Sequence, residues 1–119
     1  NINSTSSLSI KSQGFINNND IRVGGNLYVD SDYVKNSSQK IEGSVAKISS
    51  KGLLNISGSG VATNDRATSL VNEGEIVADS GFNLYADSIV NKNNIKATGN
   101  SDWGFASLEN TPLDMDFRN

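Results

Sequence analysis

The side chains in this sequence that we consider first for acid and base chemistry are the carboxylates. Cysteine and histidine are both absent. Their absence excludes disulfides and thiolate chemistry, and it removes the commonest general base and the commonest metal ligand. Because a pair of carboxylates alone can hydrolyse a glycosidic bond, acidic pairs are the first place to look for an active site.

Two acidic pairs have a spacing that could flank a sugar: Asp79 with Asp87, and Asp114 with Asp116. These residues mostly lie in polar turns or alternate with apolar residues, which is typical of the solvated face of a strand. No cluster of acids recurs on one face over three successive repeats. We therefore predict no catalytic residue and expect that the protein is not an enzyme.

A second candidate site combines glycines with nearby carboxylates. Asp30 and Asp32 follow Gly24 and Gly25, in a stretch that distantly resembles the glycine-rich nonapeptide of calcium-binding toxin repeats. The third glycine is missing and the pattern does not recur, so a solvated turn explains these residues more simply. We predict no metal ligand and no cofactor-binding residue.

The aromatic residues offer a third kind of site. Tyr28 and Tyr85 are predicted to face outward, and with Tyr33 they could form an aromatic strip for carbohydrate or protein partners. Isolated exposed tyrosines are ordinary, so the strip is one of two open interpretations. Trp103 and Phe105 share repeat positions with leucine and alanine, and we predict that they fill the core.

The elements that position these side chains repeat with a fixed spacing. From Leu70 to Asn110, residues of the same kind recur every 19 positions. The pairs are Leu70 and Ile89, Asn72 and Asn91, Ile76 and Ile95, Ala78 and Ala97, Leu84 and Trp103, and Ala86 and Phe105. A period near 20 indicates a repeat architecture in which each unit completes its core by stacking on its neighbours.

Further copies extend the repeat in both directions. A third copy begins at Leu108, and we expect Leu113 and Met115 to follow Ile95 and Ala97 after 18 residues. Residues 26–31 resemble residues 83–88, 57 positions later, which predicts three whole periods between them. The register in residues 40–69 is ambiguous. We interpret residues 61–69 as a long loop and residues 1–13 as an incomplete first coil.

Short apolar steps alternate with polar residues inside each repeat, as in Ile76-Val77-Ala78. Alternation with a period of two is the signature of a strand, and the Asn, Gly, Asp and Ser residues between the steps favour tight turns. The sequence therefore predicts an all-β fold: a single parallel β-helix over residues 1–119, with about six coils. A β-sandwich shares the short strands but has no reason to keep a period of 19.

The offsets also predict which side chains share a column. Inward-facing columns are Ile76, Ile95 and Leu113; Ala78, Ala97 and Met115; Leu84 and Trp103; and Ala86 and Phe105, with Ile21, Val23, Leu27 and Val29 at equivalent earlier positions. Outward-facing residues are Arg22, Tyr28, Val77, Tyr85, Lys96, Asp114 and Asp116. Asn72, Asn91 and Asn110 are predicted to form an internal ladder of stacked amides.

The composition narrows the possible partners. The net charge of −3 provides no basic surface for nucleic acid, and no apolar run approaches the length of a membrane-spanning helix. We expect neither nucleic-acid binding nor membrane insertion. Because the end coils of such a stack expose open strand edges, end-to-end self-association is expected as well.

The unit from Leu70 to Ala86 follows the pattern Asn-x-Gly-x-Ile-x-Ala-x-x-Gly-x-x-Leu. In this pattern it resembles the haemagglutinin repeats of filamentous haemagglutinin-type exoproteins, which bacteria export by two-partner secretion. The resemblance implies a right-handed helix in a secreted or cell-surface rod, with a structural or adhesive role and a receptor or glycan on a host or neighbouring cell as partner. Two alternatives remain: a stalk or receptor-binding part of a contact-dependent inhibition effector, and a tailspike-like β-helix that cleaves polysaccharide.

Overall fold

A computed structural model describes residues 2–37, 46–58 and 66–110 and the backbone of residues 115–118. Every regular element in these residues is a β-strand, and none is a helix. The prediction of an all-β fold is therefore confirmed. None of the described segments is a helix long and apolar enough to span a membrane.

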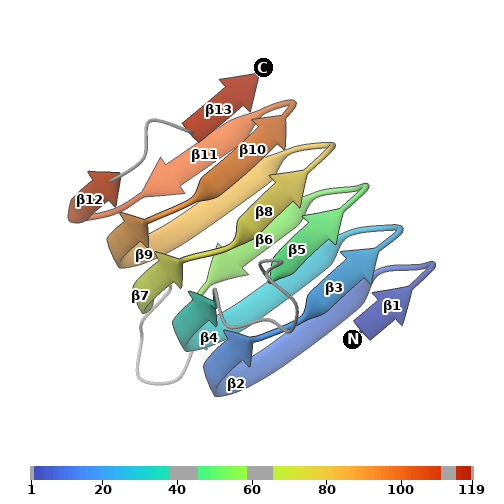
Figure 1. The fold of residues 1–119 in the computed structure, drawn as a ribbon, viewed down its shortest axis with the longest axis horizontal. Coiled ribbons are helices and arrows are strands. Elements are labelled where there is room, and N and C mark those ends of the chain that lie inside the picture. The colour runs from blue at the N-terminus through green and yellow to red at the C-terminus, as the bar shows by residue number, and fades with distance from the viewer. Residues whose placement is uncertain (1, 38–45, 59–65, 111–114, 119) are drawn as a thin grey trace.

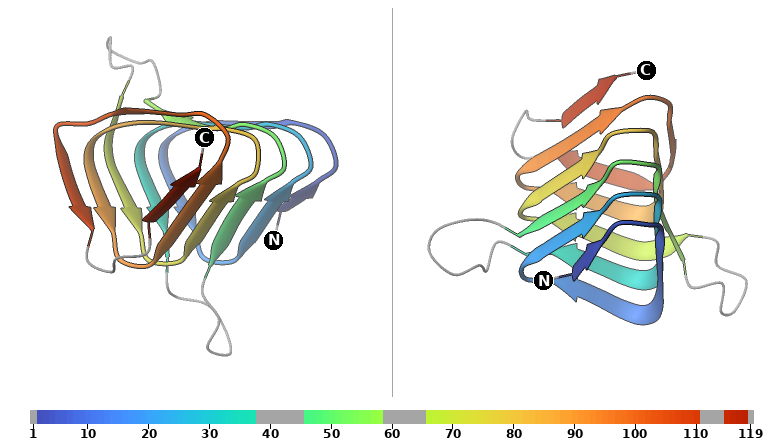
Figure 2. Two further views of the ribbon diagram at one scale, coloured as in Figure 1. Left: turned by 90° about the horizontal axis from the view of Figure 1, so that it is seen from above. Right: turned by 90° about the vertical axis from the view of Figure 1, so that its right-hand side faces the viewer.

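The described strands form two sheets with parallel pairing, and the chain passes from one sheet to the other and back (Figures 1 and 2). We call them sheet A and sheet B. Sheet A contains, in spatial order, β1 (Ile2–Ser4), β3 (Asp20–Val23), β5 (Lys47–Ser50), β8 (Glu75–Ala78), β10 (Asn94–Thr98) and β13 (Met115–Arg118). Sheet B contains β2 (Leu8–Asn17), β4 (Leu27–Asn36), β6 (Leu54–Ser57), β7 (Ala67–Asn72), β9 (Phe82–Asn91), β11 (Ser101–Gly104) and β12 (Ser107–Asn110).

Parallel pairing in register stacks identical or similar side chains in columns. One column of sheet A consists of Ile2, Ile21, Ile48, Ile76 and Ile95. From Ile21 to Ile95 these side chains are at most 2% exposed. Because successive side chains of a strand point to opposite faces, each strand sends alternate residues into the space between the sheets. The core therefore lies between the sheets and runs the length of the stack.

The predicted sorting of side chains is confirmed for most of the described residues. Buried as expected are Ile21, Val23, Leu27, Val29, Ile76, Ala78, Leu84, Ala86, Ile95 and Ala97. Arg22, Tyr28, Val77, Tyr85 and Lys96 alternate with them and are exposed or half-buried. Asp114 lies outside the described residues, and Asp116 is placed by backbone register only.

The predicted three periods between residues 26–31 and 83–88 are wrong. Val29 pairs with Ile56 and Ile56 pairs with Leu84, so a single strand, β6, separates β4 from β9 here. Leu84 therefore shares a column with Val29 and not with Leu27. The sequence similarity had aligned Leu84 with Leu27, two residues away from its actual column partner. Because a shift of two residues leaves every side chain of a strand on the same face, the apolar pattern could not reveal the error.

The register of the last copy is also different from the prediction. Met115 pairs with Ile95 and Phe117 with Ala97, so the step is 115 − 95 = 20 residues and not 18. Leu113 lies outside the described residues. The error is again two residues, and for the same reason the alternation of apolar residues could not correct it.

The predicted columns at the last turn of sheet B hold for one aromatic residue and fail for the other. Trp103 pairs with Leu84 and packs partly buried against the core, with its ring edge-on to Phe82 at 5.6 Å. Phe105 is 41% exposed, so the prediction that it fills the core is wrong. The strand β11 ends at Gly104, and Phe105 lies in the corner between β11 and β12 at the edge of the sheet.

The predicted incomplete first coil and the end of the predicted long loop both contain paired strands. Residues 2–13 supply β1 and the start of β2, which pair with β3 and β4 over their lengths. Residues 67–69, the end of the predicted loop, open β7 and are paired with β4 or β9. Residues 61–65 lie outside the described part of the chain.

Candidate functional site

The most continuous polar feature of the molecule is a column of five asparagines at one corner. Each amide nitrogen donates to the amide oxygen of the next asparagine in the stack. The bonds are Asn17 Nδ2 to Asn36 Oδ1 at 2.9 Å, Asn36 to Asn72 at 3.0 Å, Asn72 to Asn91 at 2.8 Å and Asn91 to Asn110 at 2.9 Å. The predicted ladder is confirmed, and it is two members longer than predicted.

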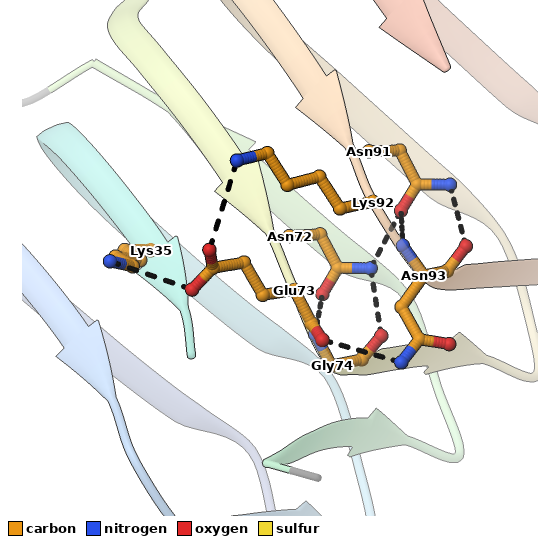
Figure 3. A network of polar contacts seen from close by, with 7 residues as sticks. All are labelled: Lys35, Asn72, Glu73, Gly74, Asn91, Lys92 and Asn93. Carbon is orange, nitrogen blue, oxygen red and sulfur yellow. Dashed lines mark hydrogen bonds and ion pairs between the residues drawn. The ribbon is translucent and has the colours of Figure 1, made fainter. Parts of the chain in front are cut away.

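Three amides of the ladder, those of Asn17, Asn72 and Asn91, also close the corner that follows them. Asn72 Nδ2 donates to the Gly74 carbonyl oxygen at 3.0 Å, while Asn72 Oδ1 accepts from the Gly74 N–H at 3.3 Å (Figure 3). Asn72 Nδ2 also donates to the Asn94 carbonyl oxygen at 3.0 Å. The Asn72 side chain is fully buried. A buried amide without partners would cost about 1–3 kcal/mol, and here every polar atom of the side chain has one. The ladder therefore couples the turns of the chain to one another.

The corner at Gly74 leaves no room for a side chain. A Cβ atom on Gly74 would overlap the Ala46 carbonyl oxygen and would lie 3.0 Å from Asn36 Nδ2. The close approach lets the Glu75 N–H donate to the same carbonyl at 2.9 Å. Only glycine fits at this position, because it has no side chain.

Outside the ladder, one carboxylate is shared by two lysines. Glu73 Oε1 lies 3.5 Å from Lys35 Nζ, and Glu73 Oε2 lies 3.9 Å from Lys92 Nζ (Figure 3). The three side chains are 23–54% exposed, so solvent screens the attraction and each pair is worth at most about 1 kcal/mol. The group links three neighbouring turns on the outer surface but creates no reactive centre.

The carboxylates of the calcium candidate are engaged within the sheet. Asp30 lies in β4 and its Oδ1 accepts a hydrogen bond from Ser57 Oγ at 2.9 Å. Between Asp30 and Asp32, Ser31 points inward, is fully buried and donates to the Tyr33 carbonyl at 3.0 Å. Among the residues that the structure describes, no three acidic side chains form a group that could hold a metal ion.

The first acidic pair, Asp79 with Asp87, is divided between the two sheets. Asp79 follows β8 of sheet A, whereas Asp87 lies within β9 of sheet B, where it forms an ion pair with Arg66 at 3.6 Å. Of the second pair, Asp114 is outside the described residues and Asp116 is placed by its backbone alone. The structure therefore does not support Asp79 and Asp87 as the paired carboxylates that glycoside hydrolysis needs.

The three tyrosines occupy different columns. Tyr28 has Ser9 and Asn55 beside it, and Tyr33 has Gly14 and Ser69 beside it. No tyrosine stacks on another, so the register does not build the aromatic strip. The outer face around Tyr28 consists mostly of polar side chains.

Tyr85 is held by a hydrogen bond on the outer face of sheet B. Its Oη donates to Asp102 Oδ2 at 2.7 Å. This hydrogen bond raises the pKa of Tyr85 because ionisation would remove the donated proton; partial desolvation and, least of all, repulsion by the Asp102 carboxylate act in the same direction. The Arg66–Asp87 ion pair adds further charged groups to this face of sheet B.

A shallow depression of about 460 Å³ lies on the outer side of sheet A near the N-terminal end. It is lined by Asn3, Ser4, Thr5, Arg22, Val23, Gly24, Ser49 and Lys51. Arg22 at this site is ion-paired with Asp20 at 3.5 Å. The depression brings together two cations, but none of its lining residues is a general base or a nucleophile with an activating partner.

The sequence did contain a signal for the two ladder members that were missed. Asn17 and Asn36 are 19 residues apart, and Ile16-Asn17 matches Val71-Asn72. The step from Asn36 to Asn72 is 36 residues, which hides the continuity of the column. Comparison with known protein families, characterised proteins and solved structures gave no match to this chain.

Proposed function

We propose that the chain is a right-handed parallel β-helix of six coils, the last represented by β13, and that it serves as a rod segment. Six strands in the spatial order of sheet A support the number of coils. The hand follows from the rule that a connection between parallel strands of one sheet is nearly always right-handed. With neighbouring strands about 4.8 Å apart, six coils extend for about 24–29 Å.

The function that follows is structural and adhesive. The segment would form part of a secreted or surface-exposed bacterial filament of the filamentous haemagglutinin type, in which it spans distance and displays its outer faces. The observation that carries this proposal is the ladder, in which five asparagines on successive coils are bonded in one unbroken column. Such a column makes the stack stiff along its axis, which a spacer needs and an isolated catalytic domain does not.

The proposed partner is a receptor or glycan on a neighbouring or host cell, recognised by side chains on the outer faces. The outer face of sheet B suits a hydroxylated ligand because its columns contain amides, hydroxyls and carboxylates. Asn55 and Asn83 pair there, and Asp102 follows Asn83. Such groups donate and accept hydrogen bonds over a flat surface.

The adhesive part is tested by measuring binding of the labelled chain to a glycan array and to bacterial and animal cells. The double variant Asn55→Arg, Asn83→Arg should reduce binding at least about tenfold, because two cations would cover the outer face of sheet B. The matched control Ser49→Arg, Val77→Arg places the same two cations on the outer face of sheet A and should leave binding unchanged, and melting curves show whether both double variants are folded. Absence of binding to every glycan and cell would refute the adhesive part.

A further inference from the structure

The outer face of sheet B carries a group of side chains that takes part in neither the ladder nor the core. Asn83 and Tyr85 face outward from β9, and the register places Asp102 beside Asn83 and Gly104 beside Tyr85 on β11. These four positions form a block on two neighbouring strands. Because Gly104 has no side chain, one position of the block is open to the side chains around it.

Two side chains lean into the space above Gly104. A Cβ atom on this glycine would lie 3.2 Å from Tyr85 Cδ1 and 3.4 Å from Arg66 Nη2. The Tyr85 ring therefore leans toward β11. Arg66 precedes β7, which pairs with β9 on the side away from β11. Its side chain must therefore cross β9 to reach Gly104, which brings the guanidinium and the aromatic ring together.

Both of these side chains are held in position by a carboxylate. Tyr85 Oη donates to Asp102 Oδ2 at 2.7 Å, and Arg66 Nη1 lies 3.6 Å from Asp87 Oδ1. The side chains of Arg66 and Asp87 are nevertheless 46% and 53% exposed, and Asp102 is exposed as well. The group is therefore already ordered before a ligand arrives, which lowers the entropic cost of binding, and it is accessible from solvent.

Access to the group does not depend on which strands adjoin it. It lies on the lateral face of the stack, where β9 and β11 are neighbours in sheet B (Figure 1). A further strand of a sheet lies in the plane of that sheet, about 4.8 Å from its neighbour. Any strand beside β11 would therefore extend the outer face and would not cover it.

The chemistry of the group matches a neutral sugar ring. One face of a pyranose presents mainly C–H groups, which pack against an aromatic ring such as that of Tyr85, while its hydroxyls bond to polar side chains around the ring. Asn83 and Arg66 supply donors, and Asp87 and Asp102 supply acceptors. With two carboxylates against one guanidinium the group is negatively charged, so a carboxylated or sulfated sugar is repelled.

We infer that the outer face of sheet B contains a subsite for one neutral sugar residue, which packs on the Tyr85 ring and is bonded at its rim by Asn83, Arg66, Asp87 and Asp102. The inference rests on the adhesive function proposed above. It adds to that function the class of sugar and the side chains that hold it.

Tyr33 provides a matched control within the same sheet. It is 38% exposed and also has a glycine, Gly14, beside it. Among the described residues, no atom beyond the neighbours of Gly14 in the chain lies within 4 Å of the position of a Gly14 Cβ. The Tyr33 ring therefore does not lean over its glycine as the Tyr85 ring does. An exposed tyrosine alone is present at both positions, but the built group is present only at Tyr85.

Binding of the full chain to paired glycans tests the subsite. The probe is an array in which each neutral oligosaccharide is matched by the same oligosaccharide with a terminal sialic acid or a sulfate. The neutral member of a pair should bind at least about tenfold more tightly, because the charged member is repelled. The double variant Asp87→Asn, Asp102→Asn keeps an acceptor oxygen at both positions, and it should bring the two affinities closer together.

Three substitutions locate the subsite, with affinity for the tightest neutral glycan measured by titration calorimetry. Tyr85→Ala should weaken binding at least about tenfold, as loss of a central aromatic contact does, whereas Tyr33→Ala should change it less than about twofold. Gly104→Val removes no group that touches the sugar, but it fills the space into which Tyr85 and Arg66 lean. It should therefore weaken binding at least about fivefold, because the subsite depends on the positions of these groups.

The inference is overturned if Tyr85→Ala and Tyr33→Ala change the affinity equally, if Gly104→Val binds as tightly as the unaltered chain, or if charged glycans bind as tightly as neutral ones. In these cases loss of binding in the Asn55→Arg, Asn83→Arg variant would leave the adhesive function standing. Binding to cells but to no glycan would have the same meaning. A chain that binds neither glycans nor cells refutes both proposals. Circular dichroism shows whether each variant folds, and if one does not, the remaining variants and the paired glycans decide.

Discussion

Replacement of Asn91 by alanine tests whether the ladder stabilises the stack. The side chain is fully buried and takes part in four hydrogen bonds. Its Nδ2 donates to Asn110 Oδ1 and to the Asn93 carbonyl, and its Oδ1 accepts from Asn72 Nδ2 and from the Asn93 N–H. Alanine would remove all four and leave a void of an amide group.

The expected loss can be estimated from the groups that are left behind. Asn72 Nδ2 keeps two carbonyl acceptors, so its loss is small. The Asn93 backbone groups and Asn110 Oδ1 lose a partner in a half-buried corner, at roughly 1 kcal/mol each. Asn91→Ala should therefore lower the free energy of unfolding by about 2–4 kcal/mol. In a chain of this size that corresponds to a fall in melting temperature on the order of 10 °C.

Thermal unfolding followed by circular dichroism measures this change. Asn83→Ala is the matched control, because Asn83 is a half-buried asparagine on the outer face of β9, and its replacement should change stability by less than about 0.5 kcal/mol. If Asn91→Ala melts within 2–3 °C of the unaltered protein, or no lower than the control, on the order of what surface substitutions do, the ladder does not carry the stability assigned to it.

Three further predictions follow from single contacts. Gly74→Ala should destabilise the protein by about 1–3 kcal/mol in denaturant titrations, because its Cβ would overlap a backbone carbonyl, whereas Gly14→Ala, with nothing within 4 Å, should be nearly neutral. Ile76→Ala should cost about 2–5 kcal/mol because it opens a cavity in the isoleucine column; a loss below 1 kcal/mol would mean that the column is loosely packed. The raised pKa of Tyr85 means that its hydrogen bond contributes stability below the ordinary tyrosine pKa and that this contribution is lost as the pH rises through the pKa in the folded state. Asp102→Asn should return the phenolate titration, followed by absorbance, toward the ordinary range, and an unchanged titration would exclude the carboxylate as the cause.

The alternation of apolar and polar residues along each strand decided how much of the fold could be predicted from the sequence. Alternation sorted Ile76, Ala78 and Leu84 to the inside and Val77 and Tyr85 to the outside, as the structure has them. The same period made the register of distant copies uncertain by two residues, because a shift of two leaves each side chain on its face. Leu84 was therefore aligned with Leu27 when its column partner is Val29.

For the candidate sites, too, the sequence showed which residue types are present, and only the fold showed which of them lie together. The sequence shows that cysteine and histidine are absent, which excludes thiolate chemistry and removes the commonest general base from the possible active-site residues. Only the fold shows that Asp79 and Asp87 belong to different sheets and that Asp87 pairs with Arg66. Tyr28 and Tyr85 face outward as predicted, but the register places them in separate columns.

The sequence by itself determined that this chain is all-β and repetitive and that an asparagine recurs at one corner, because these properties depend on local alternation and on a spacing of 19 residues. The tertiary structure decided which copies are neighbours. Asn36 bonds to Asn72 across 36 residues because strands pair by register in space and not by distance along the chain, so the extra residues between them do not interrupt the column. The same pairing decided which strands are neighbours in each of the two sheets.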